Sequence, residues 1–384
     1  MRILFVTHSA FLPEVKRGQE RNTDQLCRAL IKRGHEPGVV AGLISAGFVG
    51  KWASLRSKLG EHRRALVDRF AGYPTYRSWD VDFCFDQVLD DFRPDIVVVQ
   101  SWIHTVAQCV AREIPVAYYI HAANEPPDPV TDAVRRETLW LTVSDFAARH
   151  NGGAHGLNFH VIPPLVEPAL YRLKHHERRD ATFIGLQNFK GGELVVKLAR
   201  ACPEIPFLIF DNVDRNLPQW PGMTRAELRA AAASLPNVTI RAPAKGVEAI
   251  YGTTKVLLAP SRYHEAWGRV ASEAQINGIP VLASDRGGLP EAVGPGGVCL
   301  DYDAPIEVWA AHLQAMWHDE AHYATLSQRA LAHAARPEFQ PAAIIERFAE
   351  LIEARAAGIV VPAPRLWRDA AAAAAESGRL SGAA

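Results

Sequence analysis

The 384-residue sequence has little cysteine, no excess of either charge and no long apolar run. Its five cysteines are scattered and never form a C-x-x-C pair, which disfavours a disulfide framework or a zinc site. Lys plus Arg and Asp plus Glu both number 42, so no basic excess points to nucleic acid. No run of about 18 apolar residues occurs and no basic-then-apolar leader precedes the strand-like RILFVTH. We therefore expect a cytoplasmic chain with reduced, mostly buried cysteines that does not span a membrane.

Short apolar runs alternate with helical patterns along the chain, which is typical of doubly wound α/β domains with parallel sheets. The length suits two such domains. We expect an N-terminal domain over 1–165, a C-terminal domain over 166–340, and a helical segment over 341–384 with an alanine-rich tail. Ligands of such sheets bind at the carboxyl ends of the strands, so the predicted site is a cleft between the domains. The predicted strands cover 3–7, 38–41, 95–100, 116–120, 140–143, 160–162, 181–184, 207–210, 238–241, 255–258, 280–283 and 297–300, and the predicted helices cover 20–33, 193–201, 225–234 and 269–277.

The clearest functional pattern is the stretch SRYHEAWGRVASEAQINGIPVLASDRGGLPE. Two glutamates, Glu265 and Glu273, stand eight positions apart, with Gly268 between them and Gly287-Gly288 downstream. An apolar strand runs into a turn whose amides at 267–270 begin a helix, and the positive end of that helix suits a diphosphate. Glu273, two turns along, is suited to accept hydrogen bonds from a ribose diol, while Glu265 faces what lies beyond the phosphates. The pattern predicts a nucleotide-sugar site.

Five segments, the last of them the end of this stretch, resemble together with the E-x7-E pair the retaining glycosyltransferases of family 4. They are TFIGLQNFKGG, RALIKRGHE, RPDIVVVQS, LTVSDF and the GIPVLASDRGGLPE that follows the E-x7-E pair. The resemblance covers nearly the whole chain. It implies a GT-B fold, in which two Rossmann-like domains face each other across a cleft and the C-terminal helical segment crosses back to the first domain. It also implies transfer of a sugar from a nucleotide diphosphate sugar to an acceptor hydroxyl, with retention of configuration and without a metal or other cofactor.

The resemblance assigns roles to single residues. Lys190 matches the lysine that contacts the donor diphosphate, Glu273 the glutamate that binds the ribose, and Glu265 the one that touches the donor sugar. Gly18 matches the glycine of the first strand-to-helix loop, where the missing side chain lets the backbone approach phosphate. His121, after the strand VAYYI, matches a histidine that lines the reacting sugar. The predicted catalytic residues are thus His121, Lys190 and Glu265, and the predicted donor-binding residues are Gly18, Lys190, Gly268, Arg269, Val270 and Glu273, with no metal ligands.

The sequence departs from the family at two places. Members commonly carry an arginine just after the glycine that stands here at Gly185, but Leu186 follows. Either Arg269 or Arg262 is expected to supply the missing charge, unless Arg269 points to solvent instead. The first loop has Arg17-Gly18 in place of a glycine pair.

The resemblance suggests front-face substitution, because no carboxylate in the matched motifs is placed to form a glycosyl intermediate. A donor phosphate oxygen then takes the acceptor proton, Lys190 and backbone amides stabilise the leaving group, and His121 and Glu265 orient the sugar. These residues also have purely structural interpretations. His121 is then a histidine at a strand end, Lys190 is a turn lysine, and Ser284 with the glycine pair only shapes a turn.

Residues 51–79 carry seven basic side chains against Glu61 and Asp68. Leu55, Leu59, Leu66 and Phe70 are spaced for one face of a helix. Two interpretations fit: a solvated face over an ordinary core stripe, or an interfacial helix for anionic lipid or a phosphorylated acceptor, which would place the chain at the inner membrane face.

Two other functions fit the same patterns. One is a nucleotide-sugar epimerase of GT-B fold, which the joint presence of the KG pair and E-x7-E disfavours. The other is a catalytically silent nucleotide-sugar-binding protein, which the missing arginine after Gly185 makes conceivable. The sequence leaves the donor base, the sugar and the acceptor open, whether the acceptor is a small molecule, a lipid or a saccharide, and we expect the acceptor loops in the first domain.

Overall fold

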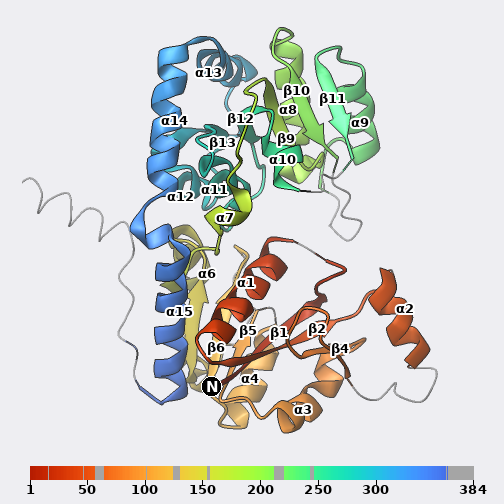
Figure 1. Ribbon diagram of the computed structural model, residues 1–384, viewed down its shortest axis with the longest axis vertical. Helices are drawn as coiled ribbons and strands as arrows, with labels where there is room; N and C mark the ends of the chain where they lie inside the picture. The colour runs from red at the N-terminus through yellow and green to blue at the C-terminus, as the bar shows by residue number, and fades with distance from the viewer. Residues whose placement is uncertain are drawn as a thin grey trace, which may run out of the picture. The chain divides into compact units, whose positions relative to one another are not determined.

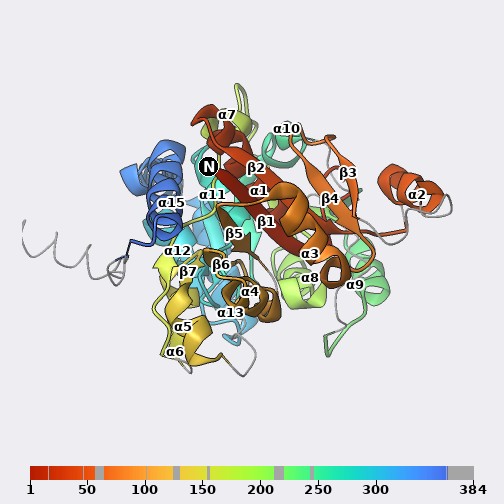
Figure 2. The ribbon, with the colours of Figure 1, turned by 90° about the horizontal axis from the view of Figure 1, so that it is seen from below.

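The computed structural model describes residues 1–15, 17–45, 47–56, 65–100, 102–123, 130–153, 156–211, 220–242, 246–359 and 361. The chain divides into two units (Figures 1 and 2). Unit 1 contains Met1–Leu165 and Pro341–Ala384, and unit 2 contains Val166–Gln340. Each unit has its own sheet, with helices packed on it.

Unit 1 is built on an eight-stranded sheet. Its strands are β1 (Arg2–Ala10), β2 (Glu36–Gly42), β3 (Leu66–Asp68), β4 (Thr75–Ser78), β5 (Ile96–Val99), β6 (Val116–Ile120), β7 (Thr138–Thr142) and β8 (His160–Val161). Their order is β3-β4-β2-β1-β5-β6-β7-β8, and among the described strands only β3 runs antiparallel to its neighbour. The strand order reverses between β1 and β5, so their carboxyl ends form the switch point where doubly wound sheets bind ligands.

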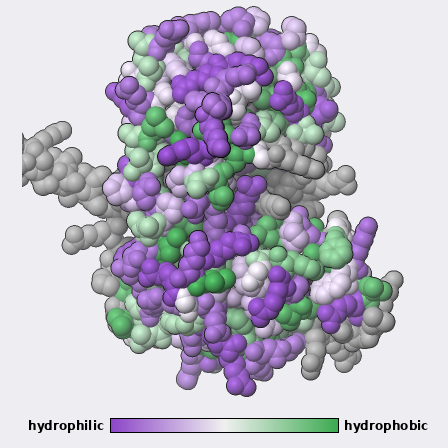
Figure 3. All heavy atoms as spheres, in the orientation of Figure 1, coloured by the Kyte–Doolittle hydropathy of each residue, from purple (hydrophilic) through white to green (hydrophobic). Residues whose placement is uncertain are grey.

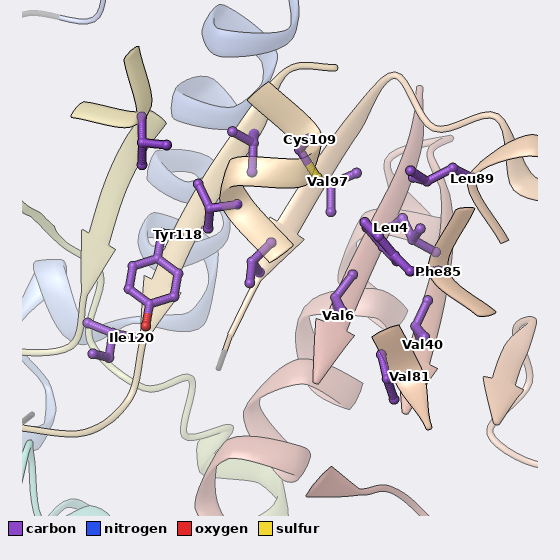
Figure 4. Packing of buried hydrophobic residues seen from close by; sticks show 14 of the residues in the cluster. Leu4, Val6, Val40, Val81, Phe85, Leu89, Val97, Cys109, Tyr118 and Ile120 are labelled. Carbon is purple, nitrogen blue, oxygen red and sulfur yellow. The ribbon is translucent and has the colours of Figure 1, made fainter. Parts of the chain in front are cut away.

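Helices cover both faces of this sheet. They are α1 (Gly18–Lys32), α2 (Gly47–Arg56), α3 (Val81–Phe92), α4 (Ile103–Ala111), α5 (Asp132–Glu137), α6 (Asp145–Gly153) and α15 (Pro341–Ala356). Asp80 caps α3 by accepting a hydrogen bond from the Phe83 amide at 3.1 Å. Figure 4 shows apolar side chains of α3 and α4, Phe85 and Cys109 among them, against Val6 and its neighbours on the central strands. Because both faces are covered, the buried segments Ile3–Val6 of β1 and Ile96–Val99 of β5 are apolar throughout.

The last described helix, α15, belongs to unit 1 although 175 residues of unit 2 precede it in the chain. It contacts α1, β5, β6 and β7, and Figure 1 shows it in blue beside these elements. The Phe348 ring lies 6.1 Å from that of Phe5 and 5.8 Å from that of Tyr119. Phe5 lies between Leu4 and Val6 in the strand and therefore points to the opposite face, so α15 covers the side of the sheet away from α3.

Unit 2 has a six-stranded, wholly parallel sheet. The strands are β9 (Asp180–Ile184), β10 (Phe207–Phe210), β11 (Val238–Arg241), β12 (Thr254–Ala259), β13 (Val281–Ser284) and β14 (Gly297–Leu300), and the helices are α7 (Pro168–Tyr171), α8 (Gly192–Ala201), α9 (Arg225–Ala233), α10 (Val247–Tyr251), α11 (Arg269–Gln275), α12 (Leu289–Val293), α13 (Ile306–His318) and α14 (Glu320–Ala334), with 3-10 turns η2 (Asn188–Lys190), η3 (Gly294–Gly296) and η4 (Pro337–Phe339). The order is β11-β10-β9-β12-β13-β14, so here the switch point lies between β9 and β12.

The predicted α/β class and doubly wound sheets are confirmed, and every predicted strand and helix overlaps an observed one. All five cysteines are free thiols and four are buried, as expected. On the face drawn in Figure 3, hydrophilic residues cover most of the surface and hydrophobic ones occur singly or in small groups. No helix of the described residues is long and apolar enough to cross a membrane. The predicted alanine-rich tail lies outside the described residues.

The helical face predicted within residues 51–79 is wrong. The helix α2 ends at Arg56, and Leu66 lies instead in β3, where its side chain is buried. Phe70 follows that strand, and Leu59 lies outside the described residues. The apolar spacing of this stretch satisfies both a helix and a pair of short strands, and the antiparallel pairing of β3 with β4 decides between them.

Candidate functional site

Lys190 lies after the carboxyl end of β9, at the end of the short turn η2. The next residue, Gly191, has φ +89°, and a Cβ atom built on it would lie 1.8 Å from the carbonyl oxygen of Pro260. Only glycine allows this approach. Pro260 directly follows β12, the neighbour of β9, so the glycine holds the lysine turn against the end of the adjacent strand.

Glu265 follows β12 and forms an ion pair with Lys190 through its Oε1 atom. Its Oε2 atom accepts a hydrogen bond from the hydroxyl of Tyr263 at 3.3 Å. The Glu265 carbonyl accepts the amide of Gly288 at 2.7 Å, and a Cβ atom on Gly287 would lie 2.1 Å from that same carbonyl oxygen. The loops after β9, β12 and β13 therefore meet at Glu265, and the glycine pair shapes this turn.

Two aromatic rings lie beside Lys190, and a third ring packs against them. Its Nζ atom lies 5.5 Å from the ring centre of Phe189 and 5.3 Å from that of Tyr263, within cation–π range. Trp220 lies 6.3 Å from each of those two rings. Burial raises the pKa of Tyr263, and the negative charge of Glu265 raises it further, so the phenol stays protonated and donates. Sequence reasoning missed this aromatic group, although Tyr263 stands only two positions before Glu265.

Glu273, on α11, is buried and has a partner on each oxygen. Oε1 accepts from Arg269 Nε at 3.0 Å, and Oε2 accepts from the Tyr251 hydroxyl at 2.9 Å. Burial raises the pKa of Tyr251, and Glu273 adds to that shift. Arg269 also donates to the hydroxyl of Tyr171 at 3.3 Å. The carboxylate is thus fixed in place, and each of its oxygens retains a second lone pair for a hydroxyl donor.

Gly268 sets the start of α11. Its φ is +103°, and a Cβ atom there would lie 2.5 Å from a methyl carbon of Leu289. The first amides of a helix lack acceptors within the helix, and here the first two belong to Arg269 and Val270, while the Ala271 amide donates to the Gly268 carbonyl at 2.9 Å. This is the predicted amide cluster, although α11 ends at Gln275, two residues earlier than expected.

The two arginines proposed to replace the missing cation are both near this region. The side chain of Arg269 is mostly buried and pairs with Glu273, so the solvent-facing alternative is wrong. Arg262 donates its backbone amide to the Phe189 carbonyl at 2.9 Å and its guanidinium to the Pro221 carbonyl at 2.5 Å. Arg262 therefore borders the Lys190 turn.

In unit 1, Gly18 is the first residue of α1, and no side chain caps that helix start. His121 directly follows β6. The Gln100 amide nitrogen lies 3.2 Å from His121 Nε2, and because an amide nitrogen only donates, Nε2 accepts and the ring proton sits on Nδ1. Thr23 in turn donates to the Gln100 oxygen at 2.9 Å. This chain holds the imidazole at the carboxyl edge of the sheet.

The predicted site residues therefore fall into two groups, each at the switch point of its own sheet. Unit 2 brings Lys190 and Glu265 into contact, with Glu273 on the following helix. Unit 1 holds His121 beside Gln100, which directly follows β5. The grouping within unit 2 joins a cation, two carboxylates and the amides of a helix start, which is a set suited to a sugar attached to a diphosphate.

Comparisons with known proteins show the family of the chain. Residues 16–170 match the family model described as "Glycosyltransferase Family 4", and residues 176–333 match "Glycosyl transferases group 1". The chain has the GT-B fold. It belongs to glycosyltransferase family 4. A D-inositol 3-phosphate glycosyltransferase of Corynebacterium glutamicum is 33% identical over 169 residues, which are 40% of this chain and 38% of the relative. The chain spans less than half the length of such curated relatives in these matches.

Two solved structures illustrate what the fold alone establishes. The Anabaena protein HepE in complex with UDP-glucose has a TM-score of 0.69 at 17% identity, covering 92% of this chain and 100% of that one. A UDP-GlcNAc 2-epimerase of Neisseria meningitidis, bound to UDP-GlcNAc, has a TM-score of 0.55 at 14% identity, covering 92% and 100%. An epimerase therefore shares this architecture, and the fold alone does not separate transfer from epimerisation.

Proposed function

We propose that the chain transfers a sugar from a nucleotide diphosphate sugar to an acceptor hydroxyl, with retention of configuration and without a metal ion in the transfer step. The observation that carries the proposal is the contact between Lys190 and Glu265 at the switch point of unit 2, beside the amides that begin α11. A departing nucleoside diphosphate gains negative charge, and in the absence of a metal these groups are the ones placed to stabilise it.

The ion pair suggests how the donor enters. Lys190 is 32% exposed and Glu265 15% exposed, so the ammonium is accessible while it contacts the carboxylate. A diphosphate competes with Glu265 for the ammonium, and the released carboxylate oxygen then accepts a sugar hydroxyl. With the donor bound, Oε2 still accepts from the Tyr263 hydroxyl and Oε1 accepts from the sugar, which lowers the nucleophilicity of the carboxylate. This supports front-face substitution, in which the donor phosphate oxygen takes the acceptor proton and His121 orients the sugar.

Glu273 supports the same assignment of the donor end. Its carboxylate is held between Arg269 and Tyr251, so a ribose diol meets an acceptor that does not need to be ordered on binding. The Arg269 guanidinium, fixed 3.0 Å from this carboxylate at the helix start, is the cation we assign to the diphosphate in place of the arginine absent after Gly185.

The test begins with donor binding, measured as thermal stabilisation by UDP, GDP, ADP, TDP and their common sugar conjugates, each with and without a chelator. A ligand present at 100 times its dissociation constant stabilises the native state by about 2.7 kcal/mol. UDP-glucose is tried first because HepE was crystallised with it, and inositol phosphates head the acceptor series because of the named relatives. A product whose anomeric proton couples as in the donor supports retention.

Each alternative has its own result. Recovery of the donor sugar as its epimer, with no acceptor needed, would establish an epimerase. Nucleotide binding without hydrolysis or transfer to any acceptor would establish a catalytically silent binding protein. Loss of transfer in the chelator would refute metal independence.

We also propose a peripheral contact of unit 1 with anionic membranes through α2 and the end of β3. Phe48 is 68% exposed, and its ring lies 5.8 Å from that of Phe70, which is also exposed. The Arg56 guanidinium lies over the Trp52 ring at 5.2 Å, and Lys51 is exposed on the same helix. Aromatic side chains flanked by cations suit the interface of an anionic bilayer.

Vesicle sedimentation tests this contact. Phe48→Ser should reduce binding to vesicles containing phosphatidylglycerol, and pure phosphatidylcholine should bind neither form. Leu331→Ser, which removes a similarly exposed apolar side chain from unit 2, serves as the control. Equal binding of Phe48→Ser and the unchanged chain would contradict the proposal.

A further inference from the structure

Unit 1 contains a group of three side chains that the proposed transfer does not use. His8 lies near the carboxyl end of β1, Asp82 in the first turn of α3, and His104 in the first turn of α4. The Nε2 atoms of both histidines contact the same Oδ1 atom of Asp82, at 2.9 Å from His8 and 2.7 Å from His104. Among the described residues, this is the only group of three or more histidine, cysteine, aspartate or glutamate side chains that could hold a metal ion.

The backbone places these side chains at one edge of the sheet. The register of β1 against β2 shifts between Val6 and Ala10, and such an irregularity redirects the side chains next to it. β5, the other neighbour of β1, leads into α4, so His8 and His104 stand at the switch point of unit 1. The ring of Trp102 lies 5.6 Å from each imidazole and forms one wall of the group.

We propose that His8, Asp82 and His104 bind one divalent transition-metal ion of the zinc class. Imidazole and carboxylate together suit Zn²⁺ and its neighbours, and three protein ligands with an open fourth position are common in accessible zinc sites.

The distances allow this ion with small side-chain movements. A tetrahedral ion with bonds of about 2.0–2.2 Å holds its ligand atoms about 3.4 Å apart. The two separations to Asp82 are shorter than this by less than 1 Å, and all three ligand atoms lie within 4.8 Å of one another. The ion takes the place of the proton on each Nε2 atom, and the single proton of each neutral imidazole then lies on Nδ1.

The exposure of the group leaves an entry path. His8 is 14% exposed, whereas Asp82 and His104 are 41% and 44% exposed. One ligand is therefore anchored in the protein and two face solvent, so an ion gains access without unfolding. Its open position would accept an oxygen donor such as water or an acceptor hydroxyl.

Calorimetric titration of the untagged, chelator-treated chain with Zn²⁺ tests the proposal. We expect one ion per chain, and an affinity at least about 10-fold weaker in Asp82→Asn and in His104→Ala. His318→Ala is the matched control, because His318 is an exposed helix histidine that also contacts a carboxylate, on Glu204. It should bind Zn²⁺ like the unchanged chain.

Two results would overturn the site: no Zn²⁺ binding by the unchanged chain, or binding that survives both substitutions. Circular dichroism checks the fold of each variant. If His104→Ala does not fold, the result of Asp82→Asn, which keeps the shape of the side chain, decides the test. Because the readout is binding and not turnover, the result is independent of the proposed transfer. If a chelator abolishes transfer, measuring His104→Ala in the same assay shows whether this ion is responsible.

Discussion

Replacing Lys190 with alanine should separate catalysis from stability. The ammonium contacts Glu265 and stands over two rings, but the side chain is about one-third exposed. An ion pair of that exposure contributes about 0–1 kcal/mol to folding, and a cation–π contact at such a site about 0.5–1 kcal/mol. We therefore expect Lys190→Ala to lower the free energy of unfolding by about 1 kcal/mol. The same change should slow transfer by about 100-fold or more, since a lost contact to a developing anion costs about 3 kcal/mol.

Lys255→Ala is the matched control for this change. Its Nζ atom also stands over two rings, those of Trp317 and Tyr323, but it donates to a backbone carbonyl and not to a carboxylate. Both variants should show a similar fall in melting temperature, while only Lys190→Ala loses turnover with the donor that the binding panel identifies. Near-normal turnover of Lys190→Ala would remove the lysine from the mechanism.

A double-mutant cycle with Glu265→Gln distinguishes two ways in which Lys190 acts. If the lysine stabilises the leaving group, its loss should still slow transfer strongly when residue 265 is already glutamine. If it only positions Glu265, the second substitution should add little to the first. The latter outcome would refute leaving-group stabilisation, even if each single variant is slow.

The remaining predictions concern donor binding, backbone fit and pH. Glu273→Gln should weaken nucleotide binding about 10-fold or more in calorimetry, because a hydrogen bond to a charged group is worth about 1.5–3 kcal/mol; unchanged affinity would contradict the ribose assignment. Gly191→Ala should cost at least about 1–3 kcal/mol in urea unfolding, because alanine is strained at φ +89° and its Cβ atom meets Pro260. Burial, with a nearby arginine, lowers the pKa of both His160 and His333 to about 4. In the unfolded chain the pKa of each histidine is about 6.5. The contribution of each neutral histidine to the free energy of unfolding is therefore complete above pH 6.5 and decreases as the pH falls toward 4. Between pH 7 and pH 5 the loss is about 2 kcal/mol for each histidine. The melting temperature should therefore decrease less from pH 7 to pH 5 in His333→Gln than in the unchanged chain.

Much of the fold could be predicted because its signals are local. Buried parallel strands give short apolar runs, and the helices between them show their own period, so the elements on either side of Lys190 and Glu273 were found from sequence. The stretch around Leu66 was misassigned because its spacing also fits a helix, and only pairing with β4 settles the matter. Local pattern cannot report a partner strand.

The sequence singled out residues that the structure brings together in unit 2, but it did not indicate their contacts. Lys190 and Glu265 are 75 positions apart, and their ion pair exists because β9 and β12 are neighbours in the sheet. No sequence signal indicates that Tyr251 is a partner of Glu273, since Tyr251 stands at the apolar-looking end of a helix. The three side chains His8, Asp82 and His104 follow no short motif, because they come from separate elements that meet only at the switch point.

The return of α15 to unit 1 has a consequence for synthesis of the protein. A ribosome completes β1 to β8 first, then all of unit 2, and releases Phe348 only afterwards. Until then the face of the first sheet that carries Phe5 and Tyr119 lacks its covering helix. Unit 2 is one continuous stretch, so all its elements have emerged before α15 does. Unit 2 can therefore fold before unit 1 is complete, and this face of the first sheet remains uncovered until α15 has emerged.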